Sequence, residues 1–167
     1  MNQIITINGP MASGKSTLSA ELNKRLKDYV FVDRAYIKDI MLRKVRDNDK
    51  KIAKQLSKEA AHVLIRGLMQ NRKNIIVQEL MPSSIMKHHA KELKKYKYRI
   101  KPVFLECSLK EALRRDIHRP RILKGKRPEV VIRMHERYTG PEEGLLINTE
   151  KSSLRSTIRQ VIDFVKQ

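Results

Sequence analysis

A glycine-rich stretch near the start of the chain, NGPMASGKST from Asn8 to Thr17, has the residue types and spacing that bind phosphate. It follows the apolar segment QIITI and precedes a helical pattern. Glycines let backbone N–H groups point inward at an anion, and a helix that begins near Lys15 adds the positive end of its dipole. Lys15 can then reach the β- and γ-phosphates of a nucleotide while the Ser16 hydroxyl coordinates Mg²⁺.

The loop therefore predicts ATP and Mg²⁺ as cofactors. The residues expected to bind the nucleotide are Gly9, Ala12, Ser13, Gly14, Lys15, Ser16 and Thr17. Of these, Lys15 is also expected to be catalytic and Ser16 to hold the metal.

Two carboxylates at the ends of strand-like segments are candidates for the acceptor chemistry. The segment DYVFVD ends at Asp33, and NIIVQEL carries Glu79 near its end. In an open parallel sheet ligands gather at the carboxyl ends of the strands, so both side chains should face the bound phosphate. A kinase needs one carboxylate to orient or deprotonate the acceptor hydroxyl and often another to hold the metal through water. Asp33 is the predicted base, and Glu79 is a predicted metal or substrate ligand.

Both carboxylates also have a structural alternative. Asp is a favoured N-cap, so Asp33 can instead cap a helix that begins at Arg34. Glu79 can be an ordinary solvated residue at a strand end. Arg34 and Lys38, which follow Asp33, are predicted to contact the substrate.

A third set of candidates is a run of cations that includes the Pro- and Gly-punctuated segment HRPRILKGKRP. Arg115 and Arg119 are four residues apart and share one face of a helix. Guanidinium groups on a closing element stabilise the charge of a transferring γ-phosphoryl group and help keep water out. We expect a basic lid over about residues 119–128, with Arg115 and Arg119 catalytic and Arg121 and Arg127 on the substrate. The alternative is a solvated basic loop.

Strand-like and helical patterns alternate from end to end of the chain and must position these residues. The segments expected as strands are QIITIN, DYVFVD, NIIVQEL, PVFLEC and GLLINT. Between them lie helical patterns, such as Leu18, Leu22 and Leu26 four residues apart. Helices of this length between strands require crossover connections, which predict a parallel sheet with helices on both faces. At 167 residues we expect one domain over residues 1–167, without internal repeats.

The net charge of the chain indicates what kind of binding partner it has. The chain carries 37 Lys and Arg against 18 Asp and Glu, a formal net charge of +19. Such an excess repels itself and is tolerated best beside a polyanion, so nucleic acid is the leading partner, and solvation alone is the alternative. The single cysteine, Cys107, can form no internal disulfide, and no apolar run approaches the roughly 18 residues that cross a bilayer. We expect a soluble, cytoplasmic protein.

Taken together, these motifs resemble the P-loop kinases of the nucleoside-monophosphate-kinase-like group. The resemblance rests on GPMASGKST after IITIN, Asp33 at the second strand end, VFLECSLKEALRRDIHR and RPEVVIRMHERYTGPEEGLLINTE. Within that group the chain is most similar to the polynucleotide kinase, zeta-toxin and chloramphenicol phosphotransferase branch. The resemblance implies a three-layer α/β/α fold with a five-stranded parallel sheet in the order 2-3-1-4-5. It also implies ATP–Mg²⁺ as donor, an acceptor hydroxyl served by an Asp near Asp33, and lid arginines at Arg115 and Arg119.

One position departs from the family's pattern. In polynucleotide kinases the base Asp is followed three residues later by Arg, whereas Tyr36 stands there in this chain. A shift of the register places Lys38 on the Arg and Ala35 on the Asp. With Ala35 in that place, Asp33 would position the substrate rather than act as the base.

A second basic segment bears on the acceptor. KHHAKELKKYKYRIK interleaves lysines with Tyr96 and Tyr98, and phosphate tracking by Lys with base stacking on Tyr holds single strands without sequence preference. The alternative is a solvated helix whose tyrosines pack inward. His88 and His89 are expected on different sides of that helix. Three further histidines are expected to be isolated: His62, His118 and His135.

Three functions agree with these patterns. A kinase for the 5′-hydroxyl of DNA or RNA uses the loop, the carboxylate and the charge together. A kinase for a nucleoside, nucleotide, sugar or antibiotic uses the first two and treats the charge as incidental. A non-enzymatic protein whose nucleic-acid affinity is switched by ATP needs no base. Switch GTPases are excluded because the guanine-reading Asn/Thr-Lys-x-Asp motif is absent from the sequence.

Overall fold

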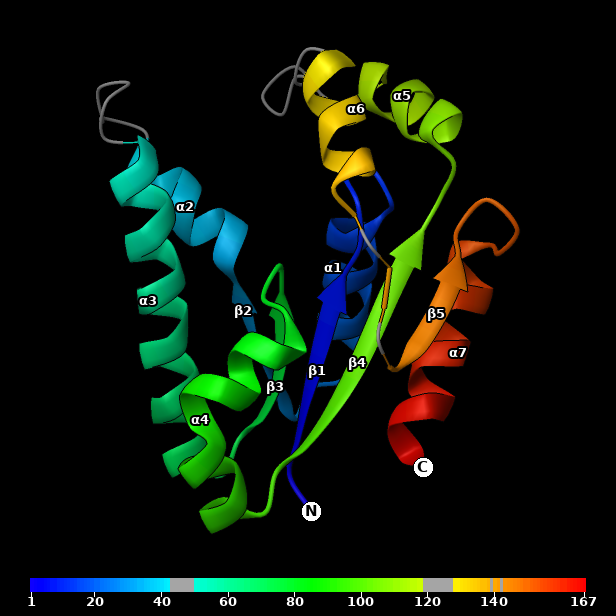
Figure 1. The fold of residues 1–167 in the computed structure, drawn as a ribbon. Helices are drawn as coiled ribbons and strands as arrows, with labels where there is room; N and C mark the ends of the chain where they lie inside the picture. Colours follow the sequence, from blue (N-terminus) through cyan, green and yellow to red (C-terminus); the bar gives the residue numbers. More distant parts are fainter. Residues whose placement is uncertain (43–49, 119–127, 139, 142) are drawn as a thin grey trace.

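The computed structural model describes residues 1–167 except 43–49, 119–127, 139 and 142. Over these residues the centre of the molecule is a five-stranded parallel sheet in the order β2-β3-β1-β4-β5 (Figure 1). Its strands are β1 (Gln3–Asn8), β2 (Tyr29–Asp33), β3 (Asn74–Gln78), β4 (Arg99–Glu106) and β5 (Leu145–Asn148). The predicted fold class and strand order are therefore confirmed. The expected lid lies outside the described residues as far as residue 127, and so do Arg119, Arg121 and Arg127.

Helices cover both faces of the sheet and its carboxyl end (Figure 1). They are α1 (Lys15–Arg25), α2 (Arg34–Leu42), α3 (Lys50–Gln70), α4 (Pro82–Tyr96), α5 (Leu109–Ile117), α6 (Pro128–Glu136) and α7 (Leu154–Lys166). The helices α1 and α7 pack on one face, and α3 and α4 pack on the other with α2 beside α3. The helices α5 and α6 pack together around Ala12, Ala112 and Val131, next to the loop that precedes α1. None of the helices in the described part of the chain is long and apolar enough to cross a bilayer.

The central strand shows why the sheet is buried on both faces. Ile4 packs into the core under α3 and α4, whereas Ile5 and Ile7 pack into the core under α1 and α7. All three are 0% exposed. Successive side chains of a strand point to opposite faces, so a strand covered on both faces reads as a continuous apolar run. Each such isoleucine stabilises the fold by about 1.5–3 kcal/mol relative to an exposed one.

The strand β4 begins three residues before the predicted start at Pro102. It pairs with β1 from Arg99, but its ladder with β5 begins only at Val103. On the β5 side Pro102 therefore lies in an unpaired stretch, where a strand tolerates a residue without an N–H donor.

The segment 87–101 runs from α4 into β4, and its two tyrosines differ. Tyr98 is 8% exposed and its hydroxyl donates to the carbonyl oxygen of Lys73 at 2.7 Å. Tyr96 is half-buried against the core under α3 and α4. The interpretation in which the tyrosines pack inward is therefore correct for Tyr98. The segment also lies at the amino end of the sheet, away from the glycine-rich loop (Figure 1).

The expectation that His62 is isolated is wrong. His62 on α3 lies with its Nδ1 3.0 Å from Nε2 of His89 on α4, and its ring stacks on that of His88 at a centroid distance of 4.0 Å. His89 is completely buried and has non-helical backbone angles that kink α4. Packing of α3 against α4 brings these rings together. One of the two facing nitrogens carries a hydrogen and donates it, and the other accepts the hydrogen bond.

This histidine cluster should make stability depend on pH. Burial, followed by the positive charges of the neighbouring histidines, lowers the pKa of His62 to about 4, and burial also lowers the pKa of His89. An unfolded histidine titrates near 6.5. Between these values the unfolded chain binds more protons than the folded chain, so the free energy of unfolding should fall as the pH drops below about 6.5.

Urea titrations at about pH 7.5 and about pH 5 test this expectation. The decrease should be smaller in His62→Gln than in the wild type, whereas His118→Gln, at an exposed histidine, should leave it unchanged. An identical decrease in wild type and His62→Gln would contradict the assignment.

Candidate active site

The glycine-rich loop joins β1 to α1 and depends on backbone conformations that favour glycine. Gly9 has φ +148° and Gly14 has φ +96°. A Cβ atom on Gly9 would clash with the carbonyl oxygen of Leu105 on β4 and lie 2.8 Å from the Ser13 hydroxyl. The loop can therefore pass this close to β4 only because residue 9 has no side chain.

The carbonyl oxygens of the loop accept hydrogen bonds from its surroundings. The ammonium group of Lys15 donates to the carbonyls of Gly9 at 3.1 Å and Pro10 at 2.8 Å. Arg115 on α5 reaches the carbonyl of Ala12 at 3.5 Å, and His135 on α6 lies 3.3 Å from that of Met11. Carbonyls held in this way leave the loop free to present its N–H groups to an anion.

The start of α1 is also suited to an anion. Its N-cap, Gly14, makes no side-chain hydrogen bond, and the first turn carries no acidic residue. By contrast, Ser108 caps α5 and Ser153 caps α7 through their hydroxyl groups. The first N–H groups of a helix need partners, and the positive end of the dipole favours a phosphate there.

Asp33 ends β2 and caps α2 as the structural alternative predicted. Its Oδ1 accepts from the backbone N–H groups of Ala35 at 2.8 Å and Tyr36 at 3.2 Å. Burial raises the pKa of Asp33, partly offset by those two hydrogen bonds, and the charges of Glu79 and Asp39 raise it further. The cap uses Oδ1 and leaves the other carboxylate oxygen of Asp33 for a ligand. The role of Asp33 as a base stays a prediction.

Glu79 follows β3 and faces the loop. One of its carboxylate oxygens lies 4.0 Å from the Lys15 ammonium, and the other lies 3.4 Å from the Arg34 guanidinium. The Nε of Arg34 also donates to the carbonyl of Glu79 at 2.8 Å. Glu79 has a positive φ of +59°, which costs a residue with a side chain about 1–2 kcal/mol and is typical of functional sites.

Gln78, which was not predicted from the sequence, lies between the side chains of Ser16 and Asp33. Its amide nitrogen is 3.3 Å from the Ser16 hydroxyl and 3.5 Å from Asp33 Oδ1. Its amide oxygen is buried and has no hydrogen-bond partner among the described residues. Gln78 is the last residue of β3, so the rule that ligands gather at strand carboxyl ends was the signal that could have found it.

The oxygens around this point fit Mg²⁺. The Ser16 hydroxyl and the carboxylates of Asp33 and Glu79 are hard oxygen donors of the kind that Mg²⁺ prefers. A magnesium ion would use only a few of them, since it keeps several waters and also binds phosphate.

Arg115 is held on the other side of the loop. Its guanidinium donates to the hydroxyl and carbonyl of Thr149, both at 2.9 Å, and to Glu111 at 2.6 Å. The Thr149 hydroxyl lies 3.2 Å from the carbonyl of Ser13. Arg115 and Thr149, the latter missed from the sequence, therefore connect α5, the end of β5 and the loop.

The other predicted site residues are less closely tied to the loop. The Lys38 ammonium lies 3.8 Å from a carboxylate oxygen of Asp39, its neighbour on α2. Thr17 is exposed on the first turn of α1. The contacts of both with nucleotide or substrate stay predictions.

Comparisons with known proteins show which family model and which folds the chain resembles. A family model described as an AAA domain matches residues 5–136. The Mycobacterium tuberculosis APS kinase CysC, solved with AMPPNP and APS, is 17% identical with a TM-score of 0.69, over 99% of this chain and 98% of that one. A gluconokinase from Sinorhizobium meliloti is 16% identical with a TM-score of 0.68, over 98% and 91%. A chain of the Pnkp1/Rnl/Hen1 RNA repair complex is 17% identical with a TM-score of 0.64, over 80% and 42%.

Comparison with curated proteins gave no match. The likenesses to solved structures establish the fold, and the expected resemblance to P-loop kinases is confirmed at that level.

Substitution of Gly9 tests the loop. Gly9→Ala should lower the free energy of unfolding by about 1–3 kcal/mol, because the new methyl group meets the Leu105 carbonyl. It should also abolish the increase in melting temperature on addition of an ATP analogue and Mg²⁺.

Gly67→Ala is the matched control. Gly67 lies within α3 and a Cβ there meets nothing within 4 Å, so the exchange should stabilise by about 0.5–1 kcal/mol and keep the nucleotide response. Retention of the wild-type nucleotide response by Gly9→Ala would contradict the assignment of the loop.

Proposed function

The chain belongs to the AAA domain family, and from this premise we propose that it is an ATP-dependent kinase that phosphorylates the 5′-hydroxyl of a nucleic acid. The phosphotransferase class, with a hydroxyl as acceptor, agrees with the kinases among the similar structures. The observation that carries the proposal is the proximity of three side chains beside the loop. The Lys15 ammonium lies 4.0 Å from Glu79, and the charge of Glu79 acts on Asp33.

The loop binds the donor. Its N–H groups and the uncapped start of α1 receive the phosphates, and Lys15 moves from the loop carbonyls to the β- and γ-phosphates. Magnesium, held by Ser16 with Glu79, would neutralise phosphate charge.

Asp33 serves the acceptor. The acceptor oxygen forms a bond to the γ-phosphorus while the bond from that phosphorus to the bridging oxygen of ADP breaks, and the hydroxyl proton passes to Asp33. The capping bonds to Ala35 and Tyr36 hold one carboxylate oxygen, which fixes the orientation of the other. Glu79 and Arg34 form the wall of the same site, where Arg34 can release Glu79 to bind a substrate phosphate.

The net charge of +19 and the chain of an RNA repair complex among the similar structures support a nucleic acid as acceptor. Arg121 and Arg127 of the basic segment, with Arg119 as a catalytic residue, belong to this proposal as groups that would meet the phosphates.

A small-molecule kinase is the second candidate. The likenesses to the APS kinase and the gluconokinase span nearly the whole of both chains, whereas the likeness to the RNA repair chain spans under half of it. The lysine- and tyrosine-rich segment 87–101 also lies at the opposite end of the sheet, so it does not line the acceptor site.

Transfer of labelled γ-phosphate to an oligonucleotide with a free 5′-hydroxyl tests the proposal. Asp33→Asn should reduce the rate by about 10²–10⁴-fold, because it removes the base. Asn is as good an N-cap as Asp, so this variant should unfold at the wild-type temperature. Asp33→Ala removes the cap as well and should cost about 1 kcal/mol of stability.

Lys15→Ala should abolish transfer together with nucleotide binding. Wild-type transfer by Asp33→Asn would exclude Asp33 as the base. A parallel screen of nucleosides, sugars and aminoglycoside-like alcohols separates the candidates, because transfer only to a small alcohol would favour the second. Hydrolysis of ATP without any acceptor would favour an ATP-switched binding protein.

The pH dependence of transfer gives an independent test. Because burial raises the pKa of Asp33, the carboxylate takes up its proton at a higher pH than an ordinary Asp. The value of kcat/KM should therefore fall as the pH decreases through this raised pKa. The residual kcat/KM of Asp33→Asn should not show this fall at low pH. If the fall is unchanged in that variant, the titrating group is not Asp33.

A further inference from the structure

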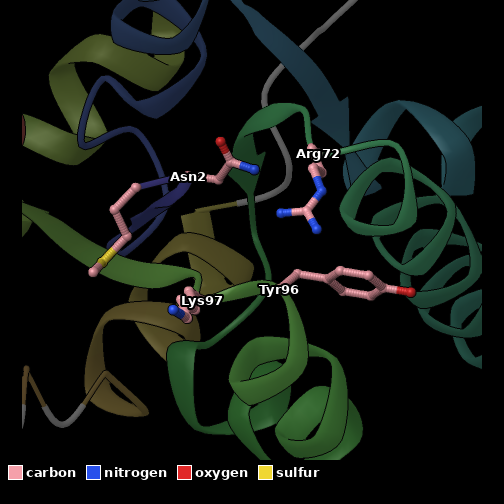
Figure 2. A pocket seen from close by; sticks show the side chains of 5 residues that line it. Asn2, Arg72, Tyr96 and Lys97 are labelled. Carbon is pink, nitrogen blue, oxygen red and sulfur yellow. The ribbon is translucent and has the colours of Figure 1, made fainter.

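A hollow of about 420 Å³ lies at the amino end of the sheet (Figure 2). It is lined by Met1, Asn2, Arg72, Tyr96 and Lys97. The backbone N–H of Arg99 donates to the carbonyl of Asn2 at 3.0 Å, which joins the start of the chain to β4. The six residues of β1 separate this hollow from the glycine-rich loop by about 20 Å, so it is no part of the transfer site.

The three segments that meet at the hollow carry cations and no carboxylate side chain. They are residues 1–3, residues 71–73 and residues 94–99. Together they hold six Lys and Arg residues and no Asp or Glu: Arg72, Lys73, Lys94, Lys95, Lys97 and Arg99. Cations at helix C-termini complement the dipole, but a few are enough for that purpose. The excess favours a polyanionic ligand.

Two of these cations occupy backbone positions that suit glycine. Arg72 has φ +53° after α3, and Lys97 has φ +56° at the C-cap of α4. Helices commonly end with glycine in this conformation, since other residues pay for it in strain. Both residues line the same hollow, and strained residues of this kind collect at functional sites.

An aromatic ring and a guanidinium plane lie together at the hollow. The guanidinium carbon of Arg72 is 5.8 Å from the centre of the Tyr96 ring, and the Lys95 ammonium is 5.2 Å from it. In Figure 2 the Arg72 guanidinium extends between Asn2 and the Tyr96 ring, with Lys97 across the hollow. Unstacked bases bind to aromatic rings and to guanidinium planes, and lysines follow the phosphates of the strand.

We propose that this hollow is a second binding site, specific for single-stranded nucleic acid and separate from the transfer site. Lys95, Lys97 and Arg99 contact successive phosphates, and a base enters the hollow beside Arg72 and Tyr96. A concave site of this kind fits an extended strand better than the flat surface of an anionic membrane. The site does not depend on phosphate transfer, so it stands whether or not the proposed kinase activity is correct.

The double variant Arg72→Gly/Lys97→Gly tests the site, and we expect it to leave the fold intact. Glycine suits both backbone positions, so the variant should melt at or above the wild-type temperature. Binding of a fluorescein-labelled single-stranded oligonucleotide is measured by anisotropy over a range of salt, without ATP or Mg²⁺. We expect at least about tenfold weaker binding, because the variant loses both the base contact of Arg72 and the phosphate contact of Lys97. The log–log salt slope should be smaller in magnitude by about 0.7, from the loss of that one phosphate contact.

The matched control is Lys51→Gln/Lys54→Gln, which removes the same charge from exposed positions on the N-terminal half of α3. It should weaken binding less than twofold, or about the effect of net charge alone. Equal losses of oligonucleotide affinity in the two double variants would contradict the proposed site. So would wild-type protein that binds phosphatidylserine-containing vesicles through these residues but no oligonucleotide.

A second comparison separates this site from the proposed kinase activity. Lys15→Ala should lose nucleotide binding but keep wild-type affinity for the oligonucleotide. Arg72→Gly/Lys97→Gly should keep its melting-temperature response to an ATP analogue with Mg²⁺. If Lys15→Ala loses as much oligonucleotide affinity as Arg72→Gly/Lys97→Gly, the proposal of a separate site is wrong. Failure of phosphate transfer alone would contradict only the proposed kinase activity.

Discussion

The orientation of the peptide groups between β1 and α1 is the constraint on which the rest of the site depends. The carbonyls of this loop accept from Lys15, Arg115, Thr149 and His135, which come from the loop's own helix, α5, the end of β5 and α6. In a peptide group the N–H points opposite to the carbonyl. The carbonyls of Met11, Ala12 and Ser13, held from α6, α5 and the end of β5, therefore direct the N–H groups of Ala12, Ser13 and Gly14 away from those elements. This orientation suits an anion, and the missing side chain at Gly9 lets the loop pass β4.

The parallel sheet brings the remaining chemistry to that loop. Because β2 and β3 run parallel to β1, their carboxyl ends deliver Asp33, Gln78 and Glu79 to the edge where the loop begins. Each of these residues has a conformation or contact that ordinary strand ends lack: a double cap, an unpartnered buried oxygen and a positive φ. The site has both carboxylates and cations close enough for their charges to influence one another.

The same topology separates the basic residues into two regions. Helices that return to the amino end of the sheet place their C-termini there, and the dipoles of α3 and α4 favour the cations of residues 72–73 and 94–97. Arg34, Lys15 and Arg115 lie at the other end, each engaged with oxygen atoms of the loop or of Glu79. A sequence with a formal charge of +19 therefore becomes a molecule with two separate basic regions, one at each end of the sheet.

The sequence by itself determined the features whose causes are local. The glycines and Lys15 define the loop, and apolar runs mark strands buried on both faces. The strand order came from the family resemblance, because spacing alone does not say which strands are neighbours. Tertiary structure decided what depends on packing between distant elements. It placed Gln78 against Ser16, Thr149 against Arg115, and His62 against His89 across two helices, and it buried Tyr98. Such contacts join residues up to 62 positions apart, and no pattern along the chain records which side chains the folded backbone brings within hydrogen-bond distance.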